Sequence, residues 1–500
     1  MTQPWFTGDA STLAAAIVRG EFSALHALEQ TLAAVEALNP RLNAVCLQRP
    51  ELARQAAAAC DAELARCHDE PARAALSLSK PFFGVPLLLK DVGPATAHPD
   101  FPSRFGSRIF GAQGQAWPVT GALTERYQAA GFVIFGRSTS PEMGISASTE
   151  ALAYGGPTRN PWHTDHSAGG SSGGAASATA SGMVAIAHAN DGAGSIRIPA
   201  SACGLIGLKP SRGLVPCGPL AGEGWGGLAI DHVVSRSVRD CATALDISAG
   251  ADPGAPYSAP ARPASFAAAL DAPPKRLRIG LCNGFFDGDP VHGDVAAVVA
   301  AFAATLQRLG HHVEESRPGF GTLDVVRPVM QVIATGTAMG LEAIATQRGR
   351  PIAQDEVEPV VWSALQVGRG FSGTDYLRAV NALHLLGRRM AAFHERYDLL
   401  LTPTLAEPPA RIGRFAMSNP DFIDYRLGPE GLWRYTPFTP LANATGAPSI
   451  SLPAGHSRDG LPIGAMLSAP LGDDALLLRL AAQWETATPQ RLAIAPGPQS

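Results

Sequence analysis

This 500-residue sequence is organised around two glycine-rich turns, His166-Ser-Ala-Gly-Gly-Ser-Ser-Gly-Gly-Ala175 and Asn190-Asp-Gly-Ala-Gly-Ser-Ile-Arg-Ile-Pro199. Each turn places a serine among glycines, here Ser171 and Ser195. Glycine permits backbone angles and close approaches that other side chains forbid. Hydrophobic segments flank both turns, which favours structured connections between strands and helices over a flexible glycine-serine loop.

Short apolar runs predict the strands of a buried sheet. Phe82–Lys90 is such a run and ends in a lysine, and Gly131–Gly136 and Met183–Ala187 are two more. Continuous apolar runs are typical of strands that helices cover on both faces. Because these strands alternate with helical segments, the sequence predicts an α/β fold.

Apolar periodicity and capping residues predict helices between the strands. Three helical segments follow one another in residues 1–66, which indicates an N-terminal helical layer. The proline-rich segment 250–274 is compatible with a domain linker or with a long surface crossover within one domain. The predicted limits are N-caps at Ser11 and Ser23, a stop at Asn39-Pro40, helices over 51–66 and 175–181, and a helix from Asp294 to Gly310 followed by a strand over 312–315.

Composition excludes several classes of protein. The formal net charge is −4 and the basic residues are scattered, so there is no electrostatic footprint for nucleic acid. Seven irregularly spaced cysteines without a CxxC pair favour neither a disulfide framework nor a zinc ribbon. The first nine residues lack the features of a signal peptide, and no uncharged apolar run approaches the ~18 residues of a membrane span. We therefore expect a cytoplasmic protein with reduced thiols and no membrane or nucleic-acid partner.

The second turn indicates a site for covalent chemistry. Successive backbone N–H groups of such a turn can converge on one point and hold an oxyanion. Ser195, at the end of the turn, would place its oxygen beside those donors. A tight connection without chemical function is the alternative for this turn alone. The first turn also matches Gly-x-Ser-x-Gly, the nucleophile elbow, but the polar segment 162–167 before it is unlike the strand that this motif requires.

Lys90 is the candidate base. It ends an apolar run, and burial without a full counter-charge lowers the pKa of a lysine until its amine can accept a proton. Serine–lysine pairs are an accepted variant of the catalytic triad. The alternative is a lysine that pairs with its neighbour Asp91 at the end of a strand. The presence of both serine turns downstream favours the catalytic interpretation, which points to hydrolysis of an amide or a related bond.

Other reactive residues are weaker candidates. The histidine pairs lack a third ligand at a suitable spacing, so we expect no metal site. The two cysteines that flank the core motif lie in apolar surroundings and are expected to be inert. Aromatic residues in glycine- and proline-rich loops belong either to the core or to a substrate pocket. These residues are His163 with His166, His311 with His312, Cys203 and Cys217, and Trp225, Trp433, Tyr435 and Phe438.

Several motifs in order resemble the amidase signature family over nearly the whole chain. The resemblance implies a single large α/β/α domain over residues 1–500, with a central mixed sheet covered by helices and no cofactor. Within it we expect the helical layer 1–66, a catalytic core 80–215 and a variable substrate-loop region 315–438. The motifs are Gly84-Val-Pro-Leu-Leu-Leu-Lys-Asp91, the two turns, Cys203-Gly-Leu-Ile-Gly-Leu-Lys-Pro210, Ser235-Arg-Ser-Val-Arg-Asp240 and Asn443-Ala-Thr-Gly-Ala-Pro-Ser-Ile-Ser-Leu-Pro453.

The family also implies roles for individual residues. Ser195 resembles the nucleophile, Ser171 the bridging serine after a cis Gly170–Ser171 peptide bond, and Lys90 the neutral base. Asp191 and Arg197 are placed to form a structural ion pair beside the nucleophile. The oxyanion donors implied are the N–H groups of Gly192, Ala193, Gly194 and Ser195, and Ser146, Gly170, Trp225 and Phe438 are expected to support the site or contact substrate.

Two positions depart from the common family pattern. Ala193 stands where many members have glycine, and Asn190 where many have threonine. The methyl group of Ala193 requires an ordinary φ beside the oxyanion hole. We expect activity to survive this change.

The substrate is expected to be a small neutral, rather hydrophobic amide, with aryl amides favoured and esters or carbamates such as urethanes also open to the same attack. The motif sequences most resemble those of aryl acylamidases and cyclic-dimer nylon-oligomer hydrolases. The alternatives are the amidase subunit of a tRNA-dependent amidotransferase and a non-catalytic binding protein on the same fold. The sequence is compatible with a homodimer but does not determine the oligomeric state.

Overall fold

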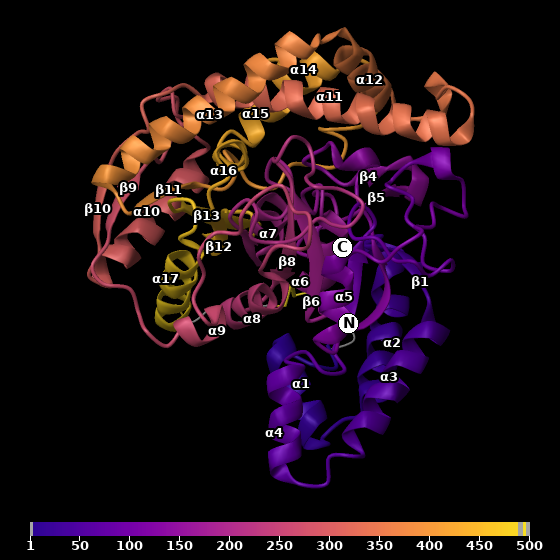
Figure 1. Ribbon diagram of the computed structural model, residues 1–500. Helices are drawn as coiled ribbons and strands as arrows, with labels where there is room; N and C mark the ends of the chain where they lie inside the picture. Colours follow the sequence, from indigo (N-terminus) through magenta and orange to yellow (C-terminus); the bar gives the residue numbers. More distant parts are fainter. Residues whose placement is uncertain (1–3, 489–493, 497–500) are drawn as a thin grey trace.

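A computed structural model describes residues 4–488 and 494–496 of the chain. Eleven strands form one mixed sheet in the order β1-β3-β2-β6-β8-β7-β12-β13-β11-β9-β10, and helices pack against it (Figure 1). The predicted α/β fold with a mixed sheet is therefore confirmed. The strands are β1 Val45–Gln48, β2 Pro86–Lys90, β3 Val133–Ser138, β6 Ile186–Asp191, β7 Ile206–Lys209, β8 Ile230–Ser235, β9 Arg278–Leu281, β10 His312–Glu315, β11 Leu399–Pro403, β12 Ser449–His456 and β13 Pro462–Ser468, and β4 Glu150–Ala151 pairs with β5 Gly156–Pro157.

Two groups of helices that are far apart in the sequence lie at opposite ends of the molecule. Figure 1 shows α1 to α4 at one end of the molecule and α11 to α14 as a long cap at the other. The α-helices are α1 Ala10–Arg19, α2 Ala24–Leu42, α3 Pro50–Leu64, α4 Glu70–Ser79, α5 Ala122–Ala129, α6 Gly173–Ala180, α7 Arg197–Cys203, α8 Val238–Ser248, α9 Phe266–Ala269, α10 Gly293–Arg308, α11 Thr322–Arg348, α12 Pro359–Gly370, α13 Gly373–Arg396, α14 Phe422–Leu427, α15 Leu432–Tyr435, α16 Thr439–Thr445 and α17 Asp474–Ala487; short 3₁₀ turns cover Arg108–Phe110, Glu142–Gly144, Leu152–Tyr154 and Gln354–Glu356.

The strand order brings the candidate residues together. Strand β2 lies between β3 and β6 and runs parallel to both, so the carboxyl ends of all three strands lie at the same edge of the sheet. Lys90 ends β2, and Asp191 ends β6 immediately before the second glycine turn. Strands β3 and β6 continue past their apolar runs into polar residues, and they therefore end later than predicted, at Ser138 and Asp191.

Helix limits were predicted less well than helix positions. The N-cap of α1 is Asp9, whose carboxylate accepts the Thr12 N–H, so the prediction of Ser11 was wrong. Helix α2 begins after Ser23 as predicted but continues through Pro40 to Leu42 and ends at Asn43, whose N–H bonds to the Asn39 carbonyl. Likewise the Asp294 carboxylate binds the backbone N–H of Arg458 rather than its own helix, which His292 caps.

Two larger segments also differ from their predictions, and for a third the structure favours one of two alternatives. The helical layer 1–66 contains strand β1, which forms one edge of the sheet by pairing with β3. The region 315–438 consists mostly of helices rather than loops, among them α11 and α13. Segment 250–274 connects α8 to β9, and since β8 and β9 belong to one sheet this favours a crossover over a linker. The single-domain organisation over 1–500 stays a prediction.

Helix α11 is long and apolar enough to cross a membrane by length and composition alone. In this structure it packs against α12, α13 and α16, and its buried residues include Val329, Ile333 and Leu341. A core helix of a folded protein passes the same test, so α11 is weak evidence for a membrane span.

Candidate active site

Lys90 lies fully buried at the end of β2 and contacts two polar side chains. Its Nζ donates to Ser171 Oγ at 2.7 Å and to Asn190 Oδ1 at 2.6 Å. The Asn190 amide is oriented in turn, because its Nδ2 donates to the Val92 carbonyl at 2.7 Å. The amine is therefore held between the two glycine turns.

Burial lowers the pKa of Lys90 to about 7, although the charges of Asp231 and Asp191 oppose the shift. Asp91 does not pair with the lysine. Its carboxylate accepts the Arg104 N–H and the Tyr154 hydroxyl instead. The alternative of a Lys90–Asp91 pair at the end of the strand is therefore not found, and Lys90 is available as a neutral base near pH 7.

The Gly170–Ser171 peptide bond is cis, as the family resemblance implied. Gly170 has no room for a side chain, since a Cβ atom there would lie 2.7 Å from the carbonyl carbon of Ala147. Ser171 is almost fully buried and directly precedes α6, whose N-cap is Ser172. The turn thus presents the Ser171 hydroxyl to Lys90.

Ser195 lies between β6 and α7 and keeps part of its surface exposed. It lines a cavity together with Ser171 and Asn190. The turn before it needs glycine at position 194, where φ is +130° and a Cβ atom would lie 2.3 Å from Thr439 Oγ1. Ala193 does not have a positive φ, so its methyl group causes no backbone strain.

The structure corrects one member of the predicted oxyanion hole. The Gly194 N–H donates to Asp191 Oδ1 at 2.6 Å, so it is already committed to an internal hydrogen bond. Within the described residues no hydrogen bond uses the N–H groups of Gly192, Ala193 or Ser195. These three donors remain available to a ligand beside the Ser195 hydroxyl.

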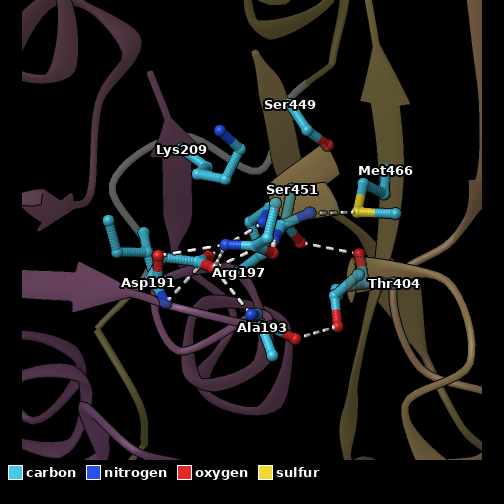
Figure 2. A network of polar contacts seen from close by, with 12 residues as sticks. Asp191, Ala193, Arg197, Lys209, Thr404, Ser449, Ser451 and Met466 are labelled. Carbon is cyan, nitrogen blue, oxygen red and sulfur yellow. Dashed lines mark hydrogen bonds and ion pairs between the residues drawn. The ribbon is translucent and has the colours of Figure 1, made fainter. Parts of the chain in front are cut away.

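A buried ion pair holds this turn in shape (Figure 2). Asp191 and Arg197 form a two-point contact, with Nε to Oδ2 and Nη2 to Oδ1 both at 2.9 Å. The Asn443 amide bonds to both partners, through Nδ2 to Asp191 and through Oδ1 from Arg197. Burial alone would raise the pKa of Asp191, but the Arg197 charge and these hydrogen bonds lower it to about 2. Arg197 Nη1 contacts Met466 Sδ at 3.5 Å, so each guanidinium nitrogen of Arg197 has a partner among the described residues, as expected for a structural ion pair.

We expect Asp191→Asn to lower the free energy of unfolding by about 3–5 kcal/mol, because it leaves the Arg197 charge buried without its partner. Urea denaturation of the purified variant measures this. Asp398→Asn is the matched control, since Asp398 pairs with a half-exposed Arg278 and its loss should cost about 1 kcal/mol or less. Equal losses of unfolding free energy in the two variants would contradict the proposal that the buried Asp191–Arg197 pair stabilises the turn.

Two neighbouring cavities share Gly144, Ser195 and Trp225 among their lining residues. The Trp225 ring lies over Gly192, where a Cβ atom would be 2.7 Å from Trp225 Cε3. The first cavity, called here the relay cavity, is lined by Val92, Phe105, Met143, Gly144, Ser171, Asn190, Gly192, Ser195, Gly224, Trp225, Ala229, Gly336, Thr337 and Gly340. The second, called the α11 cavity, is lined by Gly144, Ile145, Ser146, Ala147, Ala193, Ser195, Ile198, Trp225, Val326, Val329, Met330, Ile333, Arg426, Leu432, Trp433, Thr436 and Pro440.

The remaining predicted residues divide between the cavities and the core. Ser146 lines the α11 cavity and shares a 2.5 Å hydrogen bond with the Tyr425 hydroxyl. Phe438 is fully buried against Phe285 and Phe286 and lines neither cavity, so its predicted contact with substrate is corrected to core packing. Trp433 lines the α11 cavity.

None of the histidine and cysteine candidates lines either cavity. No group of three or more potential metal ligands occurs in the described ranges 4–488 and 494–496. The side chains bind other partners instead: His166 the Pro409 carbonyl, His311 Gln483 and His312 Glu314. All seven cysteines are unpaired, and burial raises the pKa of Cys203 and Cys217. The two thiols are thus poorly reactive.

Sequence patterns did not reveal several residues of the site. Asn190 was noted only as a departure from the family pattern, yet it binds Lys90. Asp231 is linked to Lys90 through His188, which bonds to the Asp231 carboxylate with one ring nitrogen and accepts the Lys90 backbone N–H with the other. Arg426 comes from the variable region and lines the α11 cavity. Only the position of Asn190 inside a motif was a usable signal, because the other contacts are formed between distant segments.

Comparisons with known proteins show the family of this chain. The sequence profile of the amidase family matches residues 26–478. The chain is 35% identical over 493 residues to the 6-aminohexanoate-cyclic-dimer hydrolase of Pseudomonas sp. (strain NK87), covering 96% of this chain and 95% of that one. The chain belongs to the amidase signature family. It is accordingly a hydrolase of amide carbon–nitrogen bonds other than peptide bonds.

Solved structures of the family are similar over the full length. A structure of 6-aminohexanoate cyclic dimer hydrolase superposes with a TM-score of 0.87 at 33% identity, covering 100% of this chain and 99% of that one. A bacterial aryl acylamidase gives a TM-score of 0.88 at 27% identity, with full coverage of both chains. The amidase fold is therefore shared by the whole described chain.

Proposed function

We propose that this amidase works through a Ser195–Ser171–Lys90 relay and a covalent acyl-enzyme. The observation that supports the relay most directly is the 2.7 Å contact of Lys90 Nζ with Ser171 Oγ, in a cavity that Ser195 also lines. A lysine whose pKa is lowered to about 7 can accept a proton at neutral pH, which an ordinary lysine cannot do.

The steps follow from these positions. Ser195 Oγ attacks the amide carbonyl carbon while its proton passes to Ser171, whose own proton passes to Lys90. The N–H groups of Gly192, Ala193 and Ser195 stabilise the oxyanion. The relay then returns a proton to the leaving amine as the C–N bond breaks. A water molecule attacks the acyl-enzyme by the same relay in reverse and releases the carboxylic acid.

The proposed substrates are neutral, rather hydrophobic amides, including aryl amides. Aliphatic and aromatic side chains make up much of both cavities, and Trp225, whose ring packs on Gly192 and Gly336, provides a flat apolar surface for an aryl group. Esters and carbamates such as urethanes undergo the same attack at their carbonyl carbon and are included in the proposal. A cytoplasmic location and a homodimer remain predictions from the sequence.

The purified chain, without partner subunits, should release 4-nitroaniline from small acyl 4-nitroanilides. Mass spectrometry of the intact protein during turnover should detect one added acyl group, which hydroxylamine removes. Turnover by the isolated chain would exclude dependence on amidotransferase partners. If neither aryl nor aliphatic amides, carbamates or esters acylate the protein, the proposal fails and the non-catalytic alternative gains support.

A further inference from the structure

Arg426 is the only charged side chain among the described residues that line the α11 cavity. We propose that this cavity receives the acyl part of the substrate and that Arg426 binds a carboxylate at the far end of that acyl chain. The preferred substrates would then be monoamides of apolar dicarboxylic acids, a class beyond simple neutral amides. This inference rests on the proposed acyl-enzyme function of Ser195.

The guanidinium of Arg426 is only partly satisfied by the protein. One nitrogen, Nη2, donates to the Ile145 carbonyl, and the group lies 5.4 Å from the ring centre of Phe422. Its Nε is buried and has no hydrogen-bond partner among the described residues. No acidic side chain forms an ion pair with Arg426 in the described part of the chain. A buried cation without a counter-ion is costly unless a ligand supplies the missing charge.

Arg426 remains charged in this environment. Burial lowers its pKa to about 10, and the adjacent Tyr425 opposes the shift only in part. The same burial raises the pKa of Tyr425 to about 12, so the phenol is neutral at physiological pH and provides no counter-charge. The cavity therefore presents a single positive charge to its contents at neutral pH.

The order of proton transfer in the proposed relay assigns the acyl group to the α11 cavity. The leaving amine must approach Ser171, which returns its proton, and Ser171 lines the relay cavity but not the α11 cavity. The acyl chain consequently extends into the α11 cavity. Its walls there are largely apolar and suit methylene groups, with Val326, Val329, Met330 and Ile333 from α11 and Leu432 and Trp433 from α15.

The test compares matched acyl groups with and without the terminal charge. Glutaryl, adipyl and suberyl 4-nitroanilides are assayed beside their methyl esters, which keep the carbonyl acceptor but lose the charge. In the wild type we expect kcat/KM for the free acid to exceed that for its ester by about tenfold or more at one chain length. Arg426→Gln should remove this preference, and Arg426→Lys should retain part of it.

The matched control is Arg434→Gln, because Arg434 is an exposed arginine that stacks on Trp433 without lining the cavity. This variant should keep the preference for the acid, which excludes a general attraction of anions. Thermal unfolding and titration of Ser195 with a fluorophosphonate establish that each variant is folded. A ratio near one at every chain length in the wild type, or an unchanged ratio in Arg426→Gln, would overturn the proposal.

A binding measurement separates this inference from the proposed function. Calorimetry compares adipate with hexanoate, which have the same chain length but differ in the second carboxylate. Tighter binding of adipate that disappears in Arg426→Gln supports the subsite even if no anilide is cleaved. If adipate binds the wild type and Arg426→Gln with equal affinity while anilide turnover is normal, the carboxylate subsite is refuted and the amidase mechanism is unaffected.

Discussion

Ser195→Ala is expected to lower kcat/KM for a small acyl 4-nitroanilide by about 10⁵- to 10⁶-fold, the loss typical of removing a serine nucleophile. The residual rate would come from the oxyanion donors and the substrate cavities alone. The change removes one oxygen at a half-exposed position, so the fold should be unaffected. Initial rates of 4-nitroaniline release, with thermal unfolding as the check on folding, measure the effect.

Ser201→Ala is the matched control for this variant. Ser201 lies on α7, the helix that follows Ser195, and its buried hydroxyl accepts the Gly464 N–H without lining either cavity. It should lose some stability but keep turnover within about tenfold of the wild type. Fluorophosphonate labelling should disappear in Ser195→Ala and persist in Ser201→Ala. Labelling of Ser195→Ala at another serine, with retained turnover, would assign the nucleophile elsewhere.

Lys90→Met is expected to lower kcat/KM for the same anilide by about 10³- to 10⁴-fold at neutral pH, in the range that general acid–base catalysis contributes. Methionine fills a volume similar to that of lysine, so the buried site keeps its packing while the proton acceptor is lost. The Ser171 hydroxyl then has no base beyond it. Turnover close to the wild-type rate would remove Lys90 from the mechanism.

The pH dependence gives a second measure of the same group. The active form of Lys90 is the unprotonated amine, and its pKa is lowered to about 7. We therefore expect kcat/KM of the wild type to rise with pH through a midpoint near 7 and to fall about tenfold per pH unit well below it. The midpoint would lie near that of a free lysine if burial did not shift the group.

Lys209 offers an internal control for this profile. Burial lowers its pKa to about 7 as well, but its Nζ donates to the Pro210 carbonyl and it lines neither cavity. Lys209→Met should retain the rise in activity near pH 7. Loss of this rise in Lys209→Met would assign the titration near pH 7 to Lys209 and would contradict its assignment to Lys90.

The sequence allowed the principal residues of the candidate site to be identified, because their signals are local. Glycines around Ser171 and Ser195 limit the backbone to tight turns, and the apolar run before Lys90 predicts its burial whatever the rest of the fold. The contact between Lys90 and Ser171 agrees with those expectations. The Asp191–Arg197 pair was also predictable, since both residues flank one short turn.

Two predictions did not hold because other side chains of the protein contact the group in question. Gly194 was expected to donate to an oxyanion, but the Asp191 carboxylate three residues earlier accepts its N–H first. Phe438 was expected in a pocket because it lies in a proline-rich loop. The structure buries it against two phenylalanines from a segment about 150 residues earlier, which the loop composition does not indicate.

The sequence alone therefore determined the positions of the two glycine turns, the candidates for the reactive side chains and the α/β pattern, all of which depend on neighbours within a few residues. Only the tertiary structure decided that Asn190 orients Lys90 and that Arg426 lines a cavity at Ser195. These contacts follow from the order of strands in the sheet and from the packing of the α11–α15 region near the second turn. Their physical origin lies in long-range burial of apolar surface, which brings distant segments together without a local sequence signal.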